Sequence, residues 1–241
     1  MRLDKFLSTM GCCSRADAKR IVRRGGVTVN GMPAKGADVA IDPEVDRIVF
    51  EGRHVPYRKY VYIMMNKPDG VVSATEDGRD RTVLDLLPPD VRRAGMFPCG
   101  RLDKNTLGLM LLTDNGELGH RLLAPKSHVT KVYRFESKFP VSKQDATRFE
   151  NGLVLEDGYV TLPAKIVLDA EGNSGYITLT EGKYHQIKRM LESIDNRITY
   201  LERVRFGPLT LDPALARGEW RYLTDDEIAS LEAHGKDTKN I

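Results

Sequence analysis

The sequence predicts an α+β protein made of a small basic N-terminal domain and a larger domain with a mixed, mainly antiparallel β-sheet flanked by helices. Beyond residue 60, short strand-like and helical segments follow one another irregularly, which is typical of α+β proteins rather than of regular βα repeats. Residues 52–59 are polar, include Pro56 and separate a basic stretch from an apolar one. We therefore expect domains at residues 1–58 and 61–235, followed by a flexible tail at residues 236–241.

Charge is distributed unevenly along the chain. Residues 1–60 contain 12 Lys and Arg against 7 Asp and Glu, whereas the remaining residues contain 25 against 27. A positive end of this kind is expected of a module that binds a polyanion. No apolar run approaches the ~18 residues that a bilayer span needs, and the charged start lacks the apolar core of a signal peptide. We therefore expect a cytoplasmic protein that does not bind membranes.

Cysteines, histidines and glycines give no sign of a bound cofactor. Cys12 and Cys13 are adjacent, Cys99 is distant and the histidines are scattered, so no metal-site spacing is present. Neither GxxxxGK[ST] nor GxGxxG occurs. We expect no metal and no nucleotide cofactor.

The N-terminal domain has clear helix and strand signals. Apolar residues at helical spacing predict a short helix that ends near Gly11, and Ser14 is a candidate N-cap for a second helix that runs to residue 24. Residues 27–29 and 48–50 are predicted strands, the first of which enters a tight turn at Asn30 and Gly31.

The second helix carries a row of cations with almost no acidic residues between them. A charged row is usually only a solvated surface, but here like charges would repel one another without relief. Phosphate contacts would relieve them and would make nucleic-acid binding sensitive to salt. The candidate contact residues are Arg15, Lys19 and Arg23.

The larger domain shows further strand and helix signals. Strands are predicted at residues 129–135, 176–180 and 219–223. Helices are predicted at residues 114–123, 184–194 and 225–233, the last with a capping box.

One acidic residue stands out because of its surroundings. Arg101 and Asp103 lie between Gly100 and the apolar run of residues 107–112, which is long enough for a buried strand. A charged loop attached to a buried strand is a rigid support for chemistry, although most loop aspartates only cap turns. Asp103 is therefore the leading candidate for a catalytic group.

Two other segments place polar groups on rigid elements. In residues 131–134, strand alternation puts Tyr133 on one face with Lys131. Residues 181–190 follow a strand and begin a helix that carries Lys188 and Arg189. Each has an ordinary structural explanation by itself, and His185 is expected to be a hydrogen-bonding residue at the helix start.

Taken together, the motifs resemble those of known families. Residues 1–50 resemble the αL RNA-binding domain, through Arg-Leu-Asp-Lys-Phe at residues 2–6, Ser-Arg at 14–15 and Val-Thr-Val-Asn-Gly at 27–31. The rest resembles the bacterial pseudouridine synthases, specifically the branch that acts on small-subunit (16S) ribosomal RNA. The motifs that carry this likeness are Met-Asn-Lys-Pro-Asp-Gly-Val at 65–71, Gly-Arg-Leu-Asp at 100–103, Thr-Leu-Gly-Leu at 106–109, Lys-Val-Tyr at 131–133 and Glu-Gly-Lys-Tyr-His-Gln-Ile-Lys-Arg-Met at 181–190.

The resemblance implies an enzyme that isomerises uridine to pseudouridine in ribosomal RNA without a cofactor. It places the catalytic aspartate on Asp103, the active-site tyrosine on Tyr133 and the basic partner on Lys188, with Arg189 as the alternative partner. Wider families of these enzymes carry arginine at the partner position, which makes a forked contact that lysine cannot make. Arg101 is expected to help hold the carboxylate or to wedge the RNA.

Several alternatives stay open at this point. The αL-like domain would equally suit a non-catalytic RNA-binding factor in ribosome assembly, and the enzyme could act on 23S rather than 16S ribosomal RNA. The substrate could be free RNA or an assembly particle, and the protein is expected to be a monomer. A metal-dependent nuclease using Asp77, Asp80 and Asp85 is a third and weaker hypothesis.

Overall fold

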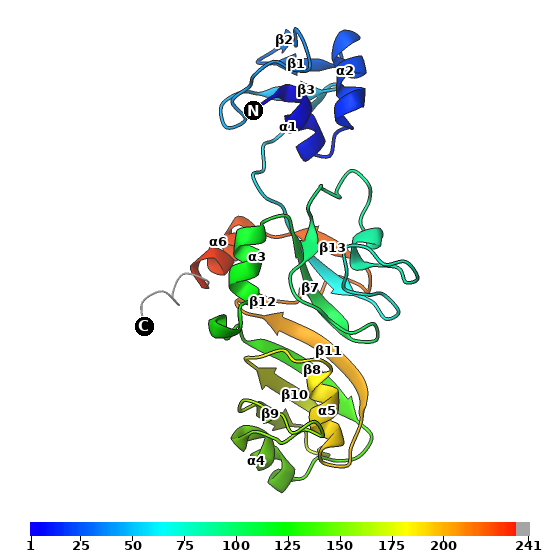
Figure 1. Ribbon diagram of the computed structural model, residues 1–241, viewed down its shortest axis with the longest axis vertical. Coiled ribbons are helices and arrows are strands. Elements are labelled where there is room, and N and C mark those ends of the chain that lie inside the picture. The colour runs from blue at the N-terminus through cyan, green and yellow to red at the C-terminus, as the bar shows by residue number, and fades with distance from the viewer. Residues whose placement is uncertain (235–241) are drawn as a thin grey trace. The chain divides into compact units, whose positions relative to one another are not determined.

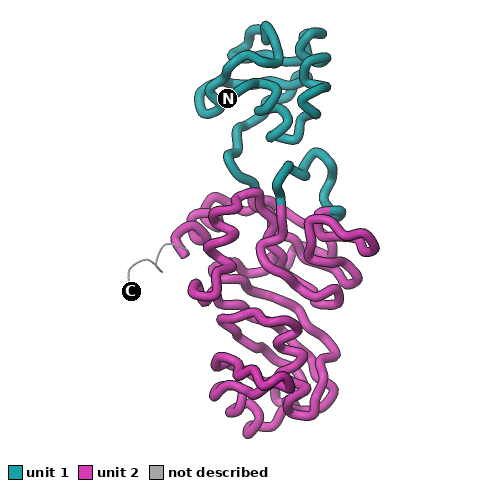
Figure 2. The backbone as a smooth tube through the Cα atoms, viewed as in Figure 1, with its two compact units in different colours: residues 1–61, 85–96 teal, residues 62–84, 97–241 magenta. Residues whose placement is uncertain are grey.

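The computed structural model describes residues 1–234, so the predicted tail at residues 236–241 lies outside the described residues. Figure 1 shows the elements, and Figure 2 shows their division into two compact units. The first unit consists of Met1–Val61 together with Asp85–Met96, and the second contains Tyr62–Leu84 and the chain from Phe97 onward. Within the described residues, no helix is long and apolar enough to cross a membrane.

The first unit combines two helices with a four-stranded antiparallel sheet in the order β2-β1-β3-β4. The elements are α1 (Leu3–Thr9), α2 (Arg15–Arg23), β1 (Val27–Val29), β2 (Met32–Pro33), β3 (Ile48–Phe50) and β4 (Arg53–Val55). Ser14 caps α2, because its hydroxyl accepts a hydrogen bond from the Asp17 amide at 3.1 Å. Asn30 and Gly31 both have positive φ angles, as the tight turn between β1 and β2 requires. The predicted helices and strands of this region are confirmed.

The core of the first unit is formed by the apolar faces of its two helices packed against β1 and β3. Phe6 and Leu7 of α1 and Ile21 of α2 are buried together with Val27 and Ile48. Because this side of α2 is buried, its charged side chains lie on the opposite, exposed side.

The second unit contains a nine-stranded sheet in which β13-β5-β7-β11-β8-β10-β9 are neighbours, β12 pairs with β11 and β6 pairs with β7. The strands are β5 (Tyr62–Lys67), β6 (Phe97–Pro98), β7 (Leu107–Thr113), β8 (Lys131–Ser137), β9 (Lys165–Leu168), β10 (Ser174–Leu179), β11 (Ile198–Phe206), β12 (Leu209–Thr210) and β13 (Trp220–Tyr222). Among the strands that the structure describes, β7 and β11 are the one pair that runs in parallel, so the expected mixed, mainly antiparallel sheet is confirmed.

Helices lie beside this sheet (Figure 1). They are α3 (Gly116–Leu123), α4 (Lys143–Asn151), α5 (Gln186–Glu192) and α6 (Asp225–His234), with short 3-10 helices η1 (Val83–Leu86) and η2 (Pro125–Ser127). Among these, α5 packs against β11 and α4 packs against β9. The position of α5 on β11 matters most for function, because it brings the segment that begins α5 close to the centre of the sheet.

The parallel pairing of β7 with β11 depends on a glycine. Gly108 has a φ of +96°, and a Cβ at this position would collide with the carbonyl oxygen of Arg203. The glycine therefore allows β11 to approach β7, and its positive φ is one that side-chain-bearing residues rarely adopt. This close approach determines where β7 begins and thus where the loop before it lies.

Strand β11 was not predicted, although it is the longest strand of the sheet. Its sequence interrupts the apolar pattern with Glu202 and Arg203, which are 8% and 1% exposed. Both have polar partners. Arg217 lies 2.8 Å from Glu202, which also accepts from the Tyr200 hydroxyl at 2.7 Å, and the Arg203 Nε donates to the Leu109 carbonyl at 2.8 Å. Helix α4 was also missed.

Candidate active site

Asp103 lies in the loop that joins β6 to β7, and this loop is anchored on both sides of the carboxylate. On one side, the Ser73 hydroxyl donates to the Leu102 carbonyl at 2.8 Å and accepts from the Leu102 amide at 3.0 Å. On the other side, the Thr106 amide donates to the carbonyl of Asp103 at 3.0 Å. These hydrogen bonds fix the backbone of the aspartate independently of the contacts that its side chain makes.

A buried lysine provides a second anchor. The fully buried ammonium of Lys67, at the end of β5, donates to the carbonyls of Pro68 at 3.0 Å, Lys104 at 3.0 Å and Thr106 at 2.9 Å. Burial lowers the pKa of Lys67 to about 8, while the nearby charges of Asp69 and Asp103 oppose that shift. Lys67 thus acts on the loop as a structural cation that joins the residues following Asp103 to the sheet.

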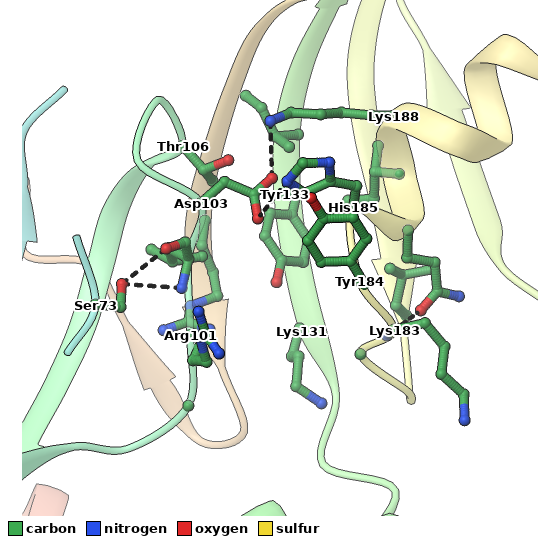
Figure 3. Close-up of a pocket in the computed structure, with 18 of the residues that line it drawn as sticks. Ser73, Arg101, Asp103, Thr106, Lys131, Tyr133, Lys183, Tyr184, His185 and Lys188 are labelled. Atoms are coloured by element: carbon green, nitrogen blue, oxygen red, sulfur yellow. Dashed lines mark hydrogen bonds and ion pairs between the residues drawn. The ribbon is translucent and has the colours of Figure 1, made fainter. Parts of the chain in front are cut away.

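The carboxylate of Asp103 faces a cavity of about 560 Å³ that is lined by residues of the second unit (Figure 3). Arg101, Asp103, Tyr133 and Lys188 all line it, so the structure brings together four of the predicted site residues. They come from three separate elements: the loop before β7, strand β8 and helix α5.

Lys188 is the ion partner of Asp103. Its Nζ lies 2.8 Å from Asp103 Oδ2 and donates to Asn105 Oδ1 at 2.8 Å. The side chains of Lys188 and Asp103 are 20% and 28% exposed. Because solvent screens their charges, the pair contributes little to the free energy of folding. Its effect is local, because the charge-assisted contact fixes the direction of the carboxylate.

Arg189, the alternative partner, lies elsewhere. Its guanidinium forms an ion pair with Asp157 at 2.5 Å. Successive residues of a helix point about 100° apart, so Lys188 and Arg189 cannot both face the same cavity wall. Among the described residues, Lys188 is thus the one of the two that contacts Asp103.

Tyr133 lies on β8 with its side chain toward the cavity and is 9% exposed. Lys131, two residues earlier on the same face, also lines the cavity, and its Nζ donates to the Val129 carbonyl at 2.8 Å. Burial and, second to it, the charge of Arg203 lower the pKa of Lys131 to about 8. One wall of the cavity therefore combines an aromatic ring with buried positive charge.

His185 does not play the role expected from the sequence. It has a left-handed backbone, with φ of 49°, and its side chain makes no capping hydrogen bond to α5. Instead the imidazole lines the cavity, where its Nε2 lies 3.6 Å from Asp103 Oδ1. The position of His185 between Tyr184 and Lys188 in one polar motif could have indicated that it faces the cavity. Helix periodicity could not, because His185 precedes the first residue of the helix.

The three cations proposed from the N-terminal helix differ in their surroundings. Arg15 forms an ion pair at 3.1 Å with Asp4, whose side chain is only 3% exposed. Lys19 and Arg23 are exposed and, among the described residues, have no carboxylate partner. They line a shallow hollow on α2. Two of the three are therefore free to contact phosphate, while Arg15 also neutralises a buried acid.

The acidic residues considered for a nuclease do not form a metal site. Within residues 1–234, no group of three or more His, Cys, Asp or Glu side chains is arranged to hold a metal ion. The Asp80 carboxylate is paired with Lys104 at 2.6 Å, and Asp77 accepts hydrogen bonds from the amides of Arg79 and Asp80.

Comparisons with known proteins assign the chain to a family. Residues 61–193 match the family model of RNA pseudouridylate synthase, and residues 1–44 match that of the S4 domain. The chain is 48% identical over 234 residues to the uncharacterized RNA pseudouridine synthase YtzG of Bacillus subtilis (strain 168), covering 96% of this chain and 98% of that protein. It is 39% identical over 232 residues to ribosomal small subunit pseudouridine synthase A of Vibrio cholerae, covering 96% and 99%.

A solved structure shows the same arrangement along nearly the whole chain. A crystal structure of a pseudouridylate synthase has 33% sequence identity and a TM-score of 0.66, and the alignment covers 96% of this chain and 99% of that one. Because it covers 96% of this chain, the alignment spans most of both the N-terminal region and the second unit, to which Asp103, Tyr133 and Lys188 belong. The chain belongs to the RNA pseudouridylate synthase family and carries an N-terminal S4 domain.

Proposed function

We propose that this protein isomerises a specific uridine of 16S ribosomal RNA to pseudouridine, with Asp103 as the catalytic carboxylate. The observation that carries the proposal is the 2.8 Å contact between Asp103 and Lys188 inside a cavity that Tyr133 also lines. RNA binding alone requires no such arrangement. The choice of 16S rests on relatives of about 40% identity that are named ribosomal small subunit pseudouridine synthase A.

The chemistry needs one ionised carboxylate beside the sugar of a uridine that has left its stack. Extrusion of the base costs a few kcal/mol, which RNA contacts must supply. Asp103 then either attacks C1′ or removes a sugar proton to give a glycal, and in both routes the N1–C1′ bond breaks. The uracil turns and C5 bonds to C1′, while the bond from Asp103 to C1′ breaks in the first route or Asp103 returns the sugar proton in the second. C5 then loses its proton and N1 gains one. Substrate and product are isomers, so the net reaction consumes no oxidant, no reductant and no group donor.

The other residues of the cavity have supporting roles. Lys188 holds the Asp103 carboxylate directed at the sugar, and the Tyr133 ring stacks on the extruded base. The Tyr133 hydroxyl is the candidate for moving the C5 proton. Arg101, which is exposed at the cavity, contacts the RNA beside the extruded uridine. We place this reaction in the cytoplasm, with the protein acting as a monomer.

The target is tested with C5-tritiated 16S and 23S transcripts, because tritium leaves C5 only when isomerisation occurs. We expect release from 16S, offered either free or bound by small-subunit ribosomal proteins, and none from 23S. Mapping of pseudouridine in ribosomal RNA from cells lacking the protein should locate one missing site. Release from 23S alone would overturn the 16S assignment, and tight binding without any release would favour the non-catalytic assembly factor.

The S4 unit is expected to supply salt-dependent affinity through α2. Each phosphate contact contributes roughly 0.7 to 0.9 to the slope of log affinity against log salt. The double variant Lys19→Gln, Arg23→Gln should therefore lower that slope by about 1.5, measured by filter binding across a salt series. Arg15 is left intact in this variant, because its loss would leave the buried Asp4 with one cation fewer.

A matched control removes the same charge from a helix of the other unit. Lys143→Gln with Arg148→Gln on α4 changes the net charge equally and should leave the slope unchanged. An unchanged slope in the α2 variant would show that this helix does not contact RNA.

A further inference from the structure

An exposed aromatic stack lies beside the catalytic carboxylate and has no part in the chemistry described so far. The rings of Tyr184 and His185 are 3.8 Å apart and only 18° from parallel. Figure 3 shows the two rings face to face, next to Tyr133 and Asp103. Tyr184 is 75% exposed although it lines the cavity, and its hydroxyl forms no hydrogen bond within the described residues.

The loop that carries this stack is held in place by hydrogen bonds. The Glu181 carboxylate accepts from Gln186 Nε2 at 2.6 Å and from the Tyr159 hydroxyl at 2.6 Å. Gln186, which is 4% exposed, also accepts from the Lys183 amide at 2.9 Å. Hydrogen bonds thus join the two ends of the segment 181–186. Tyr184 therefore lies on a rigid loop rather than on a mobile one.

Backbone strain at His185 aligns the two rings. Its φ of 49° is a left-handed conformation that costs a side-chain-bearing residue about 1 kcal/mol or more. This conformation turns the imidazole toward Asp103, 3.6 Å away, while its ring face lies against Tyr184. A strained residue that joins the catalytic group to an exposed ring indicates that the placement of the ring serves function.

The occupant of the exposed ring face follows from the reaction. When a uridine is extruded, the neighbouring nucleotides lose a stacking partner at the same place. Aromatic side chains that bind unpaired RNA provide this lost stacking, which is worth about 1–3 kcal/mol per base. Lys183, the preceding residue, adds an exposed cation at the cavity that is suited to a phosphodiester, and its ammonium lies 4.8 Å from the centre of the Tyr159 ring.

We propose that Tyr184, supported from behind by His185, is a stacking platform for the unpaired nucleobase adjacent to the target uridine. This inference builds on the proposed function, since it assigns a second nucleotide to the same site. Tyr184 stacks on the flanking base, and Tyr133 stacks on the extruded uracil. The platform would hold the RNA in register while the base turns.

A double-mutant cycle between protein and RNA tests the platform. Full-length protein is assayed on 16S RNA, assembled by ligation, that carries at the mapped uridine either an intact sequence or one abasic ribose on its 5′ or 3′ side. We expect Tyr184→Ala to lower kcat/KM on intact RNA by about 5- to 150-fold, the equivalent of one lost stack. One of the two abasic RNAs should lower wild-type kcat/KM by a similar factor and should cost Tyr184→Ala nothing further.

Two further variants make the result specific. Tyr184→Phe, which retains the ring, should retain the coupling to the abasic position. Tyr176→Ala removes an exposed tyrosine from β10 outside the cavity and should behave as the wild type on all three RNAs. Equal losses for Tyr184→Ala on every RNA, or no loss at all, would overturn the platform. Absence of wild-type activity on intact RNA would instead count against the proposed function.

Discussion

Replacing Asp103 with asparagine is expected to abolish isomerisation while leaving RNA affinity nearly unchanged. The amide is close in size to the carboxylate, so the hydrogen bonds that anchor Leu102 and Thr106 remain. It has no charge with which to attack C1′ or to remove a sugar proton. Loss of a catalytic nucleophile reduces kcat by about 10⁴-fold or more. Tritium release from C5-labelled RNA measures this, and filter binding reports affinity.

A matched acid distinguishes catalysis from loss of charge alone. Asp169→Asn changes an exposed carboxylate in the turn between β9 and β10, outside the cavity, and should keep wild-type tritium release. Undiminished release by Asp103→Asn would remove this residue from the mechanism. A parallel loss of RNA affinity would mean that Asp103 also supports the binding surface.

The second large effect is expected at Lys188. Lys188→Met removes the ammonium 2.8 Å from Asp103 while keeping an unbranched side chain that fits the same wall. The carboxylate then loses its adjacent cation, and loss of one preorganised electrostatic contact lowers kcat by about 10²- to 10³-fold. The melting temperature should change little, because partly exposed ion pairs contribute about 0–1 kcal/mol to stability.

The neighbouring position supplies the contrast. Arg189→Met breaks the ion pair with Asp157 rather than the contact with Asp103, so its effect on kcat should be far smaller. Lys188→Arg keeps the charge and should recover part of the activity lost in Lys188→Met. Single-turnover tritium release separates these effects on chemistry from effects on RNA binding. Equal losses in Lys188→Met and Arg189→Met would show that the ion pair with Asp103 is not what matters.

Local sequence patterns determined much of the fold. The Ser14 cap, the Asn30–Gly31 turn and the apolar run of β7 each depend on neighbours a few residues away, and so each was visible in the sequence. Strand β11 was not visible, because Glu202 and Arg203 are acceptable inside the sheet only with polar partners, and two of these, Arg217 and the Leu109 carbonyl, lie outside the strand. A strand that contains buried charges is therefore difficult to predict from the sequence, because the partners of those charges are not known at that point.

The candidate site likewise has features that the sequence predicts and features that only the structure shows. The sequence by itself determined that a lone carboxylate precedes a buried strand, that the N-terminal domain contains a basic helix, and that ordered motifs place Tyr133 and Lys188 in one family pattern. Only the tertiary structure decided that Lys188 rather than Arg189 contacts Asp103, that His185 faces the cavity, and that Lys67 holds the loop. Adjacent helical residues differ in direction by about 100°, and only the packing of α5 on β11 decides which of them faces the carboxylate.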